Sequence, residues 1–92
     1  MKILRVNKLD KYNYELSDNN NKYNINIEFY DIPNPEDIDK IYIHEDLLKN
    51  KMLSFGLLDD KSGRVIKSED DEDLIMLFMK NGKKVVLKRL YG

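Results

Sequence analysis

The chain has no cysteine, and it also lacks tryptophan, alanine, threonine and glutamine. Without cysteine the protein can have no disulfide framework, no thiolate zinc site and no cysteine nucleophile. The longest uninterrupted apolar run extends from Leu74 to Met79, far short of the roughly 20 residues that a membrane-spanning helix needs. No basic leader followed by an apolar stretch opens the chain, so we expect no secretory signal. These absences predict a soluble cytoplasmic protein that does not associate with membranes.

The 92 residues have a balanced composition, with 41% apolar residues, 36% charged residues and a formal net charge of −1. Disordered chains combine few apolar residues with a large net charge, and this chain shows neither property. Its length suffices for one small domain and is too short for two. We therefore expect a single β-rich domain over residues 1–92.

Strict alternation of apolar and polar residues predicts a hairpin in the first third of the chain. The alternating runs 12–17 and 22–29 flank a cluster of turn-forming residues, Asp18–Asn21. A four-residue loop pairs Ser17 with Lys22. This register gathers the apolar side chains on one inward face, which contains Tyr12, Tyr14, Leu16, Tyr23, Ile25, Ile27 and Phe29. A slip of one residue would mix the two faces, so the pattern fixes the register.

The segment 35–51 has two interpretations. An asparagine followed by Pro35 and two acids is typical of a helix start, because proline suits the first helical position and acids interact favourably with the helix dipole. Alternatively, β-branched residues at alternate positions favour a strand over Lys40–His44, followed by a short helical turn over Glu45–Lys51. The sequence favours the strand and leaves the helix open.

The dipeptide Asn81–Gly82 lies between two apolar runs, 74–80 and 83–90, and predicts a second hairpin. A two-residue type I′ turn needs positive φ at both positions, which asparagine and glycine tolerate. The resulting pairs are Phe78–Val85 and Met76–Leu87 on one face, and Met79–Lys84, Leu77–Val86 and Ile75–Lys88 on the other. The strand over 74–79 is thus apolar on both faces and must be covered on both sides.

The remaining turn-forming residues predict a bend at Ser54–Gly56 and a turn at Asp59–Gly63, and a short edge strand is expected at Arg64–Lys67. Short strands with frequent turns are typical of a barrel or sandwich. The expected fold class is all-β and mostly antiparallel, a small barrel or curled sheet of about six strands with one short helical turn. The doubly apolar strand favours closure into a barrel.

Several short segments carry a resemblance to a group of small proteins. They are Phe55-Gly56-Leu57, Ser62-Gly63-Arg64, Asp73-Leu74-Ile75 and the ending Leu87-Lys88-Arg89-Leu90-Tyr91-Gly92. Ile38-Asp39-Lys40-Ile41-Tyr42-Ile43 is similar to a barrel strand that usually begins with Gly-Asp, with Ile38 in place of the glycine. Through these residues the whole chain resembles small uncharacterised bacterial β-barrel proteins of the OB-like or SH3-like type. The resemblance implies a barrel and carries no function.

Few residues offer catalytic or metal-binding chemistry. His44 is the only histidine, so a metal site there would have neither a second histidine nor a cysteine. No nucleophile-elbow pattern surrounds a serine, and no glycine-rich phosphate loop occurs. The acidic run Glu69–Asp73 is either a Ca²⁺ or Mg²⁺ site or a solvated loop before a strand. We expect no catalytic residue, no cofactor and no metal, and hence a protein that is not an enzyme.

The leading functional hypothesis is an interaction module that docks a protein partner or a second copy of itself. One face of the C-terminal hairpin combines apolar side chains with a charged rim, as protein interfaces do. This candidate protein interface consists of Ile75, Leu77, Met79, Lys84, Val86 and Lys88.

The alternative hypothesis is an OB-like nucleic-acid binder. Both ends of the chain are basic, and their side chains would merge into one patch if the first and last strands were adjacent. The candidate nucleic-acid patch consists of Lys2, Arg5, Lys8, Lys11, Lys83, Lys84, Lys88 and Arg89. An isoelectric point of about 5.8 and the expected inward position of the aromatic residues argue against it, since single-strand binders present aromatic side chains for stacking.

Overall fold

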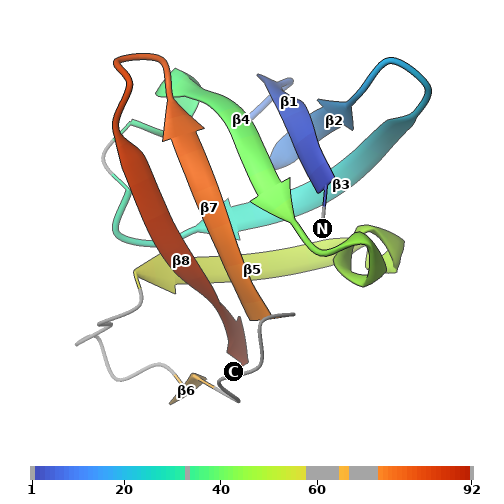
Figure 1. Cartoon of the computed structure of the whole chain (residues 1–92). Coiled ribbons are helices and arrows are strands. Elements are labelled where there is room, and N and C mark those ends of the chain that lie inside the picture. The colour runs from blue at the N-terminus through green and yellow to red at the C-terminus, as the bar shows by residue number, and fades with distance from the viewer. Residues whose placement is uncertain (1, 33, 58–64, 67–72, 92) are drawn as a thin grey trace.

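A computed structural model describes residues 2–32, 34–57, 65–66 and 73–91 of the chain. Seven strands form a closed barrel around one core (Figure 1). They are β1 (Lys2–Lys8), β2 (Asn13–Ser17), β3 (Lys22–Phe29), β4 (Ile38–Ile43), β5 (Met52–Leu57), β7 (Leu74–Met79) and β8 (Lys84–Tyr91). The short strand β6 (Val65–Ile66) is added to the ring by pairing with β8. Two 3-10 turns, η1 (Pro35–Asp37) and η2 (Glu45–Lys49), flank β4.

The order of strands around the ring is β5-β3-β2-β1-β4-β7-β8, and β8 returns to β5. Neighbouring strands are antiparallel except β3 and β5, which are parallel. The prediction of an all-β, mostly antiparallel barrel is therefore confirmed. The ring has one strand more than expected, and it has a second 3-10 turn that was not expected.

The hairpin of β2 and β3 has the register that the alternation predicts, with Ser17 opposite Lys22. Its loop is organised by Asp18, whose Oδ1 accepts the backbone N–H groups of Asn20 and Asn21 at 2.8 and 2.7 Å. These hydrogen bonds stabilise the charged carboxylate and hold the pKa of Asp18 below its usual value. The turn and the alternating strands thus specify the same pairing.

Tyr12 is the exception to the predicted inward face of this hairpin. β2 begins only at Asn13, and Tyr12 is 38% exposed in the preceding turn. That turn is fixed by Asp10, whose Oδ1 accepts the backbone N–H groups of both Tyr12 and Asn13. The local turn, rather than strand alternation, therefore sets the direction of Tyr12, and the expectation that it faces inward is wrong.

The segment 35–51 contains a strand, so the second of its two interpretations is confirmed. The proline and the acids at its start form only the single turn η1. β4 follows, and its alternate residues Ile41 and Ile43 are fully buried. η2 begins after His44, whose Nδ1 accepts the N–H of Asp46 at 3.2 Å. The extended form buries every second side chain, whereas a helix would have placed an acid within its apolar stripe.

The expected bend at Ser54–Gly56 is wrong, because these residues continue β5. Phe55 is fully buried, and its ring stacks on that of Phe29 in the parallel neighbour β3, with centroids 6.1 Å apart. Gly56 pairs with Lys88 and so helps to close the barrel. Pairing on both sides keeps extended a segment that the sequence alone marks as a turn.

Part of the region between β5 and β7 lies outside the described residues. This applies to the predicted turn Asp59–Gly63 and to most of the acidic run 69–73. Of the predicted edge strand Arg64–Lys67, the structure describes Val65 and Ile66, which form β6.

The C-terminal hairpin forms at the predicted place, but its predicted register is wrong by one residue. The N–H of Met79 donates to the carbonyl of Lys83 at 2.8 Å, so three residues rather than two make the loop. Gly82 has a φ of 89°, which is the left-handed position that a three-residue loop requires. The pairs are now Ile75–Leu87, Leu77–Val85, Met76–Val86, Phe78–Lys84 and Leu74–Lys88.

This shift reverses the direction of the side chains of β7. Ile75 and Leu77 are buried in the core, whereas Met76 and Phe78 are only half-buried and do not pack against it. Because β7 is apolar on both faces, its own pattern cannot specify which face points inward. The loop geometry and the closure of the barrel decide it.

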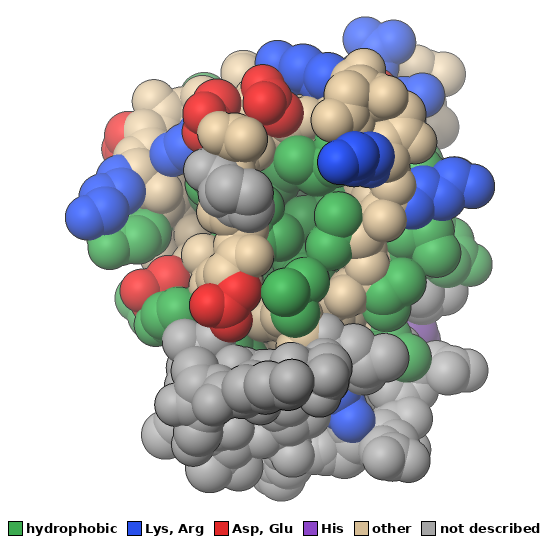
Figure 2. Space-filling model, turned by 90° about the vertical axis from the view of Figure 1, so that its left-hand side faces the viewer, with side chains coloured by type: hydrophobic (Ala, Val, Ile, Leu, Met, Phe, Trp, Pro, Cys, Tyr) green, Lys and Arg blue, Asp and Glu red, His purple; other side chains and the backbone are tan. Residues whose placement is uncertain are grey.

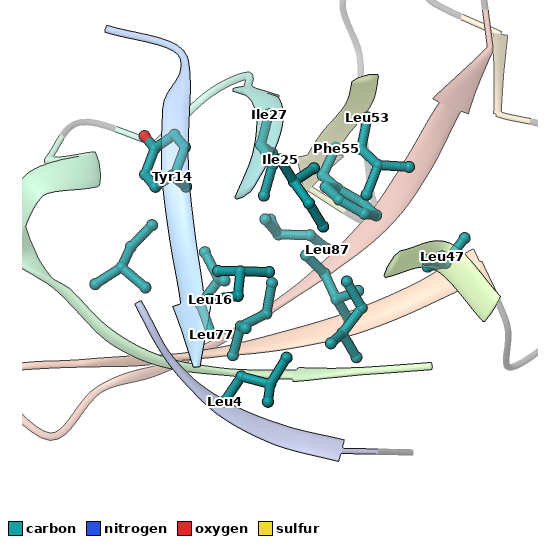
Figure 3. Close-up of a cluster of buried hydrophobic side chains, with 14 residues drawn as sticks. Leu4, Tyr14, Leu16, Ile25, Ile27, Leu47, Leu53, Phe55, Leu77 and Leu87 are labelled. Carbon is teal, nitrogen blue, oxygen red and sulfur yellow. The ribbon is translucent and has the colours of Figure 1, made fainter. Parts of the chain in front are cut away.

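The buried core receives side chains from all the strands of the ring (Figure 3). Its members are Leu4, Tyr14, Leu16, Ile25, Ile27, Ile38, Ile41, Ile43, Leu47, Leu53, Phe55, Ile75, Leu77 and Leu87. Removal of this apolar surface from water is the main driving force for the fold.

Among the core residues that the structure describes, Tyr14 alone carries a phenol. Its ring meets that of Phe29 edge to face at 5.4 Å, and its hydroxyl points away from the other labelled core side chains (Figure 3). Burial, with a smaller contribution from the charge of Glu36, raises the pKa of Tyr14 to about 12. The folded protein therefore prefers the protonated phenol more strongly than the unfolded chain does.

This pKa predicts a specific loss of stability at high pH. The contribution of protonated Tyr14 is complete below the unfolded pKa of about 10 and is lost as the pH rises toward the folded value of about 12. The free energy of unfolding, measured by denaturant titration, should fall more for the wild type than for Tyr14→Phe between about pH 9 and about pH 11. Equal pH dependence of the two proteins would show that Tyr14 ionises without a cost to folding.

Candidate binding face

The strands on two sides of the barrel differ in charge. The adjacent strands β1, β4, β7 and β8 contain seven basic residues and one acidic residue, Asp39. Strands β2, β3 and β5 contain one basic residue and two acidic residues. Figure 1 shows the first four strands side by side in front of the core. We call their outer surface the basic face, and its central residues are Ile3, Arg5, Lys40, Tyr42, Met76, Phe78, Lys84 and Val86.

Four of these side chains form an apolar row across the basic face. Backbone pairing places Ile3 opposite Tyr42, Tyr42 opposite Met76, and Met76 opposite Val86. Ile3 is 55% exposed and Val86 is 39% exposed, and the two residues between them are half-buried. None of the four packs against the buried core. Since neighbouring strands lie about 4.8 Å apart, the apolar row extends over roughly 14 Å.

The other four side chains form a basic row beside the apolar row. The same pairings place Arg5 opposite Lys40, Lys40 opposite Phe78, and Phe78 opposite Lys84. The Nζ of Lys84 lies 5.8 Å from the centre of the Phe78 ring. On every strand the basic row is two residues from the apolar row, which corresponds to about 7 Å along the strand.

A hollow of about 480 Å³ adjoins one end of the basic row. Its lining includes Arg5 and Lys40 together with Ser17 and Asn19 from the β2–β3 hairpin. Asp18 also lines it, and the Oδ2 of Asp18 lies 3.7 Å from the Nζ of Lys2. The hollow therefore combines two cations with hydrogen-bonding groups, beside a carboxylate that already has charged and N–H partners.

A second hollow, of about 270 Å³, lies at the turn end of β7 and β8. Its lining is largely apolar and includes Ile32, Leu57, Met79 and Val85. Figure 2 shows hydrophobic side chains gathered in the middle of the side that β8 borders, with basic side chains above them and to the right. The volume lies just below the range of about 300–1,000 Å³ that is usual for pockets of drug-sized ligands.

The structure does not bring the six residues of the candidate protein interface onto one surface. Ile75 and Leu77 are buried in the core, and Met79 packs against it. Lys84 and Val86 belong to the basic face, and Lys88 lies on the same side of β8 but is only 7% exposed. The one-residue change of register places the three β7 residues on the core side and the three β8 residues on the outer side. The six predicted residues therefore do not form one patch.

The structure also does not merge the basic side chains of the candidate nucleic-acid patch. β1 and β8 are not neighbours, because β4 and β7 lie between them. Arg5 and Lys84 lie in the basic row, at its two ends. The other six lie elsewhere. The Nζ of Lys2 forms an ion pair with Glu45 at 3.0 Å, and Lys8 and Lys11 lie by the rings of Tyr14 and Tyr12. Lys83 lines the second hollow, Lys88 is buried, and Arg89 lies opposite Phe55 in the pairing of β8 with β5.

Sequence reasoning did not group Lys40, Tyr42 and Phe78 on one face, although the strand interpretation of Lys40–His44 already directs Tyr42 outward. A signal for the first two was present, because a strand that buries Ile41 and Ile43 must direct Lys40 and Tyr42 outward. No such signal existed for Phe78, since its strand is apolar on both faces. The objection to nucleic-acid binding concerned Tyr12, Tyr14, Tyr23 and Phe29, and the last three of these do lie in or against the core. Tyr42 and Phe78 are two further aromatic residues, and they lie on the outer surface.

The remaining candidates have structural contacts. The Nδ1 of His44 accepts a hydrogen bond from the backbone at the start of η2. Asp73, the one described residue of the acidic run, is buried. Among the described residues, no group of three or more acidic or histidine side chains is placed to hold a metal ion. Within the same ranges, none of the helical segments has the length and apolar character that crossing a bilayer requires.

Comparison with protein families finds no family model that matches the chain. Comparisons with curated proteins and with solved structures find no match either. The functional argument therefore depends on the residues of the barrel itself.

The two sides of β7 give a matched test of the basic face. Ile75→Ala should lower the free energy of unfolding by about 2–5 kcal/mol, because it opens a cavity in the core. Met76→Ala should lower it by about 1 kcal/mol or less, because Met76 does not pack against the core. Denaturant titration of both variants measures the difference. A larger loss for Met76→Ala would mean that β7 has the opposite face inward.

Proposed function

We propose that this protein is a non-enzymatic interaction module that binds an anionic macromolecule on the basic face. The observation that carries the proposal is the pair of parallel rows, one with three cations and one with four apolar side chains. Both rows lie on extended strands of a closed barrel, which hold side chains more rigidly than a loop would.

The overall charge of the chain does not oppose this proposal. The net charge is −1, but the strands of the basic face contain seven bases against a single acid. Glu28 belongs to β3, two strands away from β1 in the ring. Glu15 belongs to β2, which neighbours β1, and its Oε1 lies 4.0 Å from the Nζ of Lys22. Charges are screened over about 8 Å at physiological salt, so a ligand on the two rows experiences mainly Arg5, Lys40 and Lys84.

The apolar row adds a reason for contact with a macromolecule. Its four side chains lie outside the core, and its two ends, Ile3 and Val86, remain substantially exposed. An apolar strip bordered by charged residues is typical of a binding surface, because the strip gains from burial while the border selects the partner. A small ion would satisfy the cations and leave the apolar row in water.

A second copy of the chain is a poor partner for this face. In a two-fold symmetric dimer the same patch meets itself, so Arg5, Lys40 and Lys84 would approach their own equivalents. Like charges at a desolvated interface oppose association. The charge pattern thus favours an acidic partner over self-association.

The proposal depends on the basic face and not on the type of barrel. Small barrels support many unrelated functions, so a functional argument must come from the side chains. The resemblance to OB-like or SH3-like barrels stays a prediction, and it is compatible with a binding role on a sheet surface.

Heparin, a sulfated polyanion, provides a direct test. The wild-type protein should be retained on immobilised heparin at about 50 mM salt and released by about 200 mM, because ion pairs with a polyanion weaken as counterions compete. The triple variant Arg5→Glu, Lys40→Glu and Lys84→Glu should lose retention. Its control is Lys11→Glu, Lys49→Glu and Lys51→Glu, which makes the same change in net charge at exposed residues away from the basic face.

The comparison of the two triple variants decides the outcome. Retention of the control together with loss in the basic-face variant supports the proposal. Equal loss in both would mean that only net charge matters, and absence of wild-type retention at low salt would exclude the proposed function.

A further inference from the structure

We propose that the anionic partner is a single-stranded nucleic acid, with phosphates along the basic row and bases stacked on Tyr42 and Phe78. This inference rests on the proposed function and names the partner class of the same face. The observation behind it is the position of two outward aromatic residues. Phe78 lies between Lys40 and Lys84, and Tyr42 lies two residues along β4 from Lys40.

The spacing of the two rows suits the chemistry of a single strand. A single-stranded nucleic acid has a charged backbone on one side and flat, largely apolar bases on the other. The basic row and the apolar row run in the same direction across the strands and are about 7 Å apart. A nucleic-acid strand that crosses the barrel along these rows can place its phosphates near Arg5, Lys40 and Lys84. Its bases can then stack on Tyr42 in the apolar row and on Phe78, which lies between Lys40 and Lys84 in the basic row.

Tyr42 and Phe78 form the stacking platform. Lys40 is opposite Phe78, and Tyr42 is opposite Met76, so the two aromatic residues are diagonal neighbours on adjacent strands. Such neighbours lie roughly 7–8 Å apart, which allows each ring to receive a separate base. Both are half-buried and do not pack against the core, and the Nζ of Lys84 lies 5.8 Å from the centre of the Phe78 ring.

The hollow next to Arg5 and Lys40 extends the site toward the β2–β3 hairpin. Ser17 and Asn19 in its lining offer donors and acceptors to a sugar or a phosphate. Asp18 contributes a negative charge there, but its Oδ1 already accepts two backbone N–H groups and its Oδ2 faces Lys2. The hollow therefore accommodates a polar continuation of the bound strand better than an apolar one.

Other polyanions use this face less completely. A duplex hides the faces of its bases, so it would engage the basic row and leave the apolar row in water. An acidic peptide would neutralise the cations, but its carboxylates bring no flat ring to Tyr42 and Phe78. The combination of both rows thus favours an unpaired nucleic-acid strand.

Fluorescence anisotropy with a labelled oligothymidine of about 12 nucleotides, within the site size of small single-strand-binding barrels, tests the inference. Three phosphate contacts predict that affinity falls by about 20-fold between about 50 and about 200 mM salt. Tyr42→Leu and Phe78→Leu should each weaken binding by about tenfold without changing the salt dependence, because they remove stacking and keep the charge. Lys40→Met should weaken binding and make the dependence of log affinity on log salt shallower by about 0.7.

Tyr12→Leu is the matched control, because Tyr12 is an exposed tyrosine outside the basic face. It should bind like the wild type. Thermal unfolding of each variant confirms that the barrel is retained, and a variant that does not fold is replaced by Tyr42→Ile or Phe78→Met at the same position.

A duplex of the same sequence and polyglutamate are the competing ligands. Stronger binding of the duplex or of polyglutamate than of the oligothymidine, or unchanged binding by Tyr42→Leu and Phe78→Leu, overturns the single-strand inference. If heparin retention persists in that case, the proposed polyanion-binding function stands and only the partner class is wrong. If neither heparin nor the oligonucleotide binds at low salt, both proposals fail.

Discussion

The register between β7 and β8 is the constraint on which the candidate face depends. β7 carries apolar side chains on both sides, so either side would be stable in the core. The hydrogen bond between Met79 and Lys83, and the left-handed Gly82 that makes the three-residue loop possible, direct Ile75 and Leu77 inward. The same choice leaves Met76 and Phe78 on the outside. A register shifted by one residue would have buried those two and exposed the present core residues.

Because the ring is closed, the register between β7 and β8 decides which side chains enter the core and which remain on the outer surface. β5 pairs with β3 in parallel and with β8 in antiparallel orientation, so the sheet has no open gap in the ring. The inward side chains then share one core, and water contacts only the outer surface. Because two of the three acids of the ring strands are on β2 and β3 while the bases concentrate on β1, β4 and β8, closure places most of the acidic and basic strand residues on different parts of the ring.

The two hairpins show how far a sequence pattern can specify pairing. Between Ser17 and Lys22 the register follows from alternation, since a slip would bury asparagine and glutamate, which have no partners in the core. No such penalty acts on β7, where a slip exchanges one set of apolar side chains for another. At Tyr12 the hydrogen bonds to Asp10 override alternation. Local pattern is therefore decisive only where the wrong arrangement would desolvate a polar group.

The sequence by itself determined the all-β class and the positions of both hairpins and favoured a strand at β4, because each follows from the local pattern of apolar, β-branched and turn-forming residues. It also located Arg5 and Lys84 as cations of interest. Only the tertiary structure decided that Lys40, Tyr42 and Phe78 join them on one surface. The physical reason is that β4 inserts between β1 and β7, and that pairing joins segments far apart in the chain. The surface arises from that order of strands.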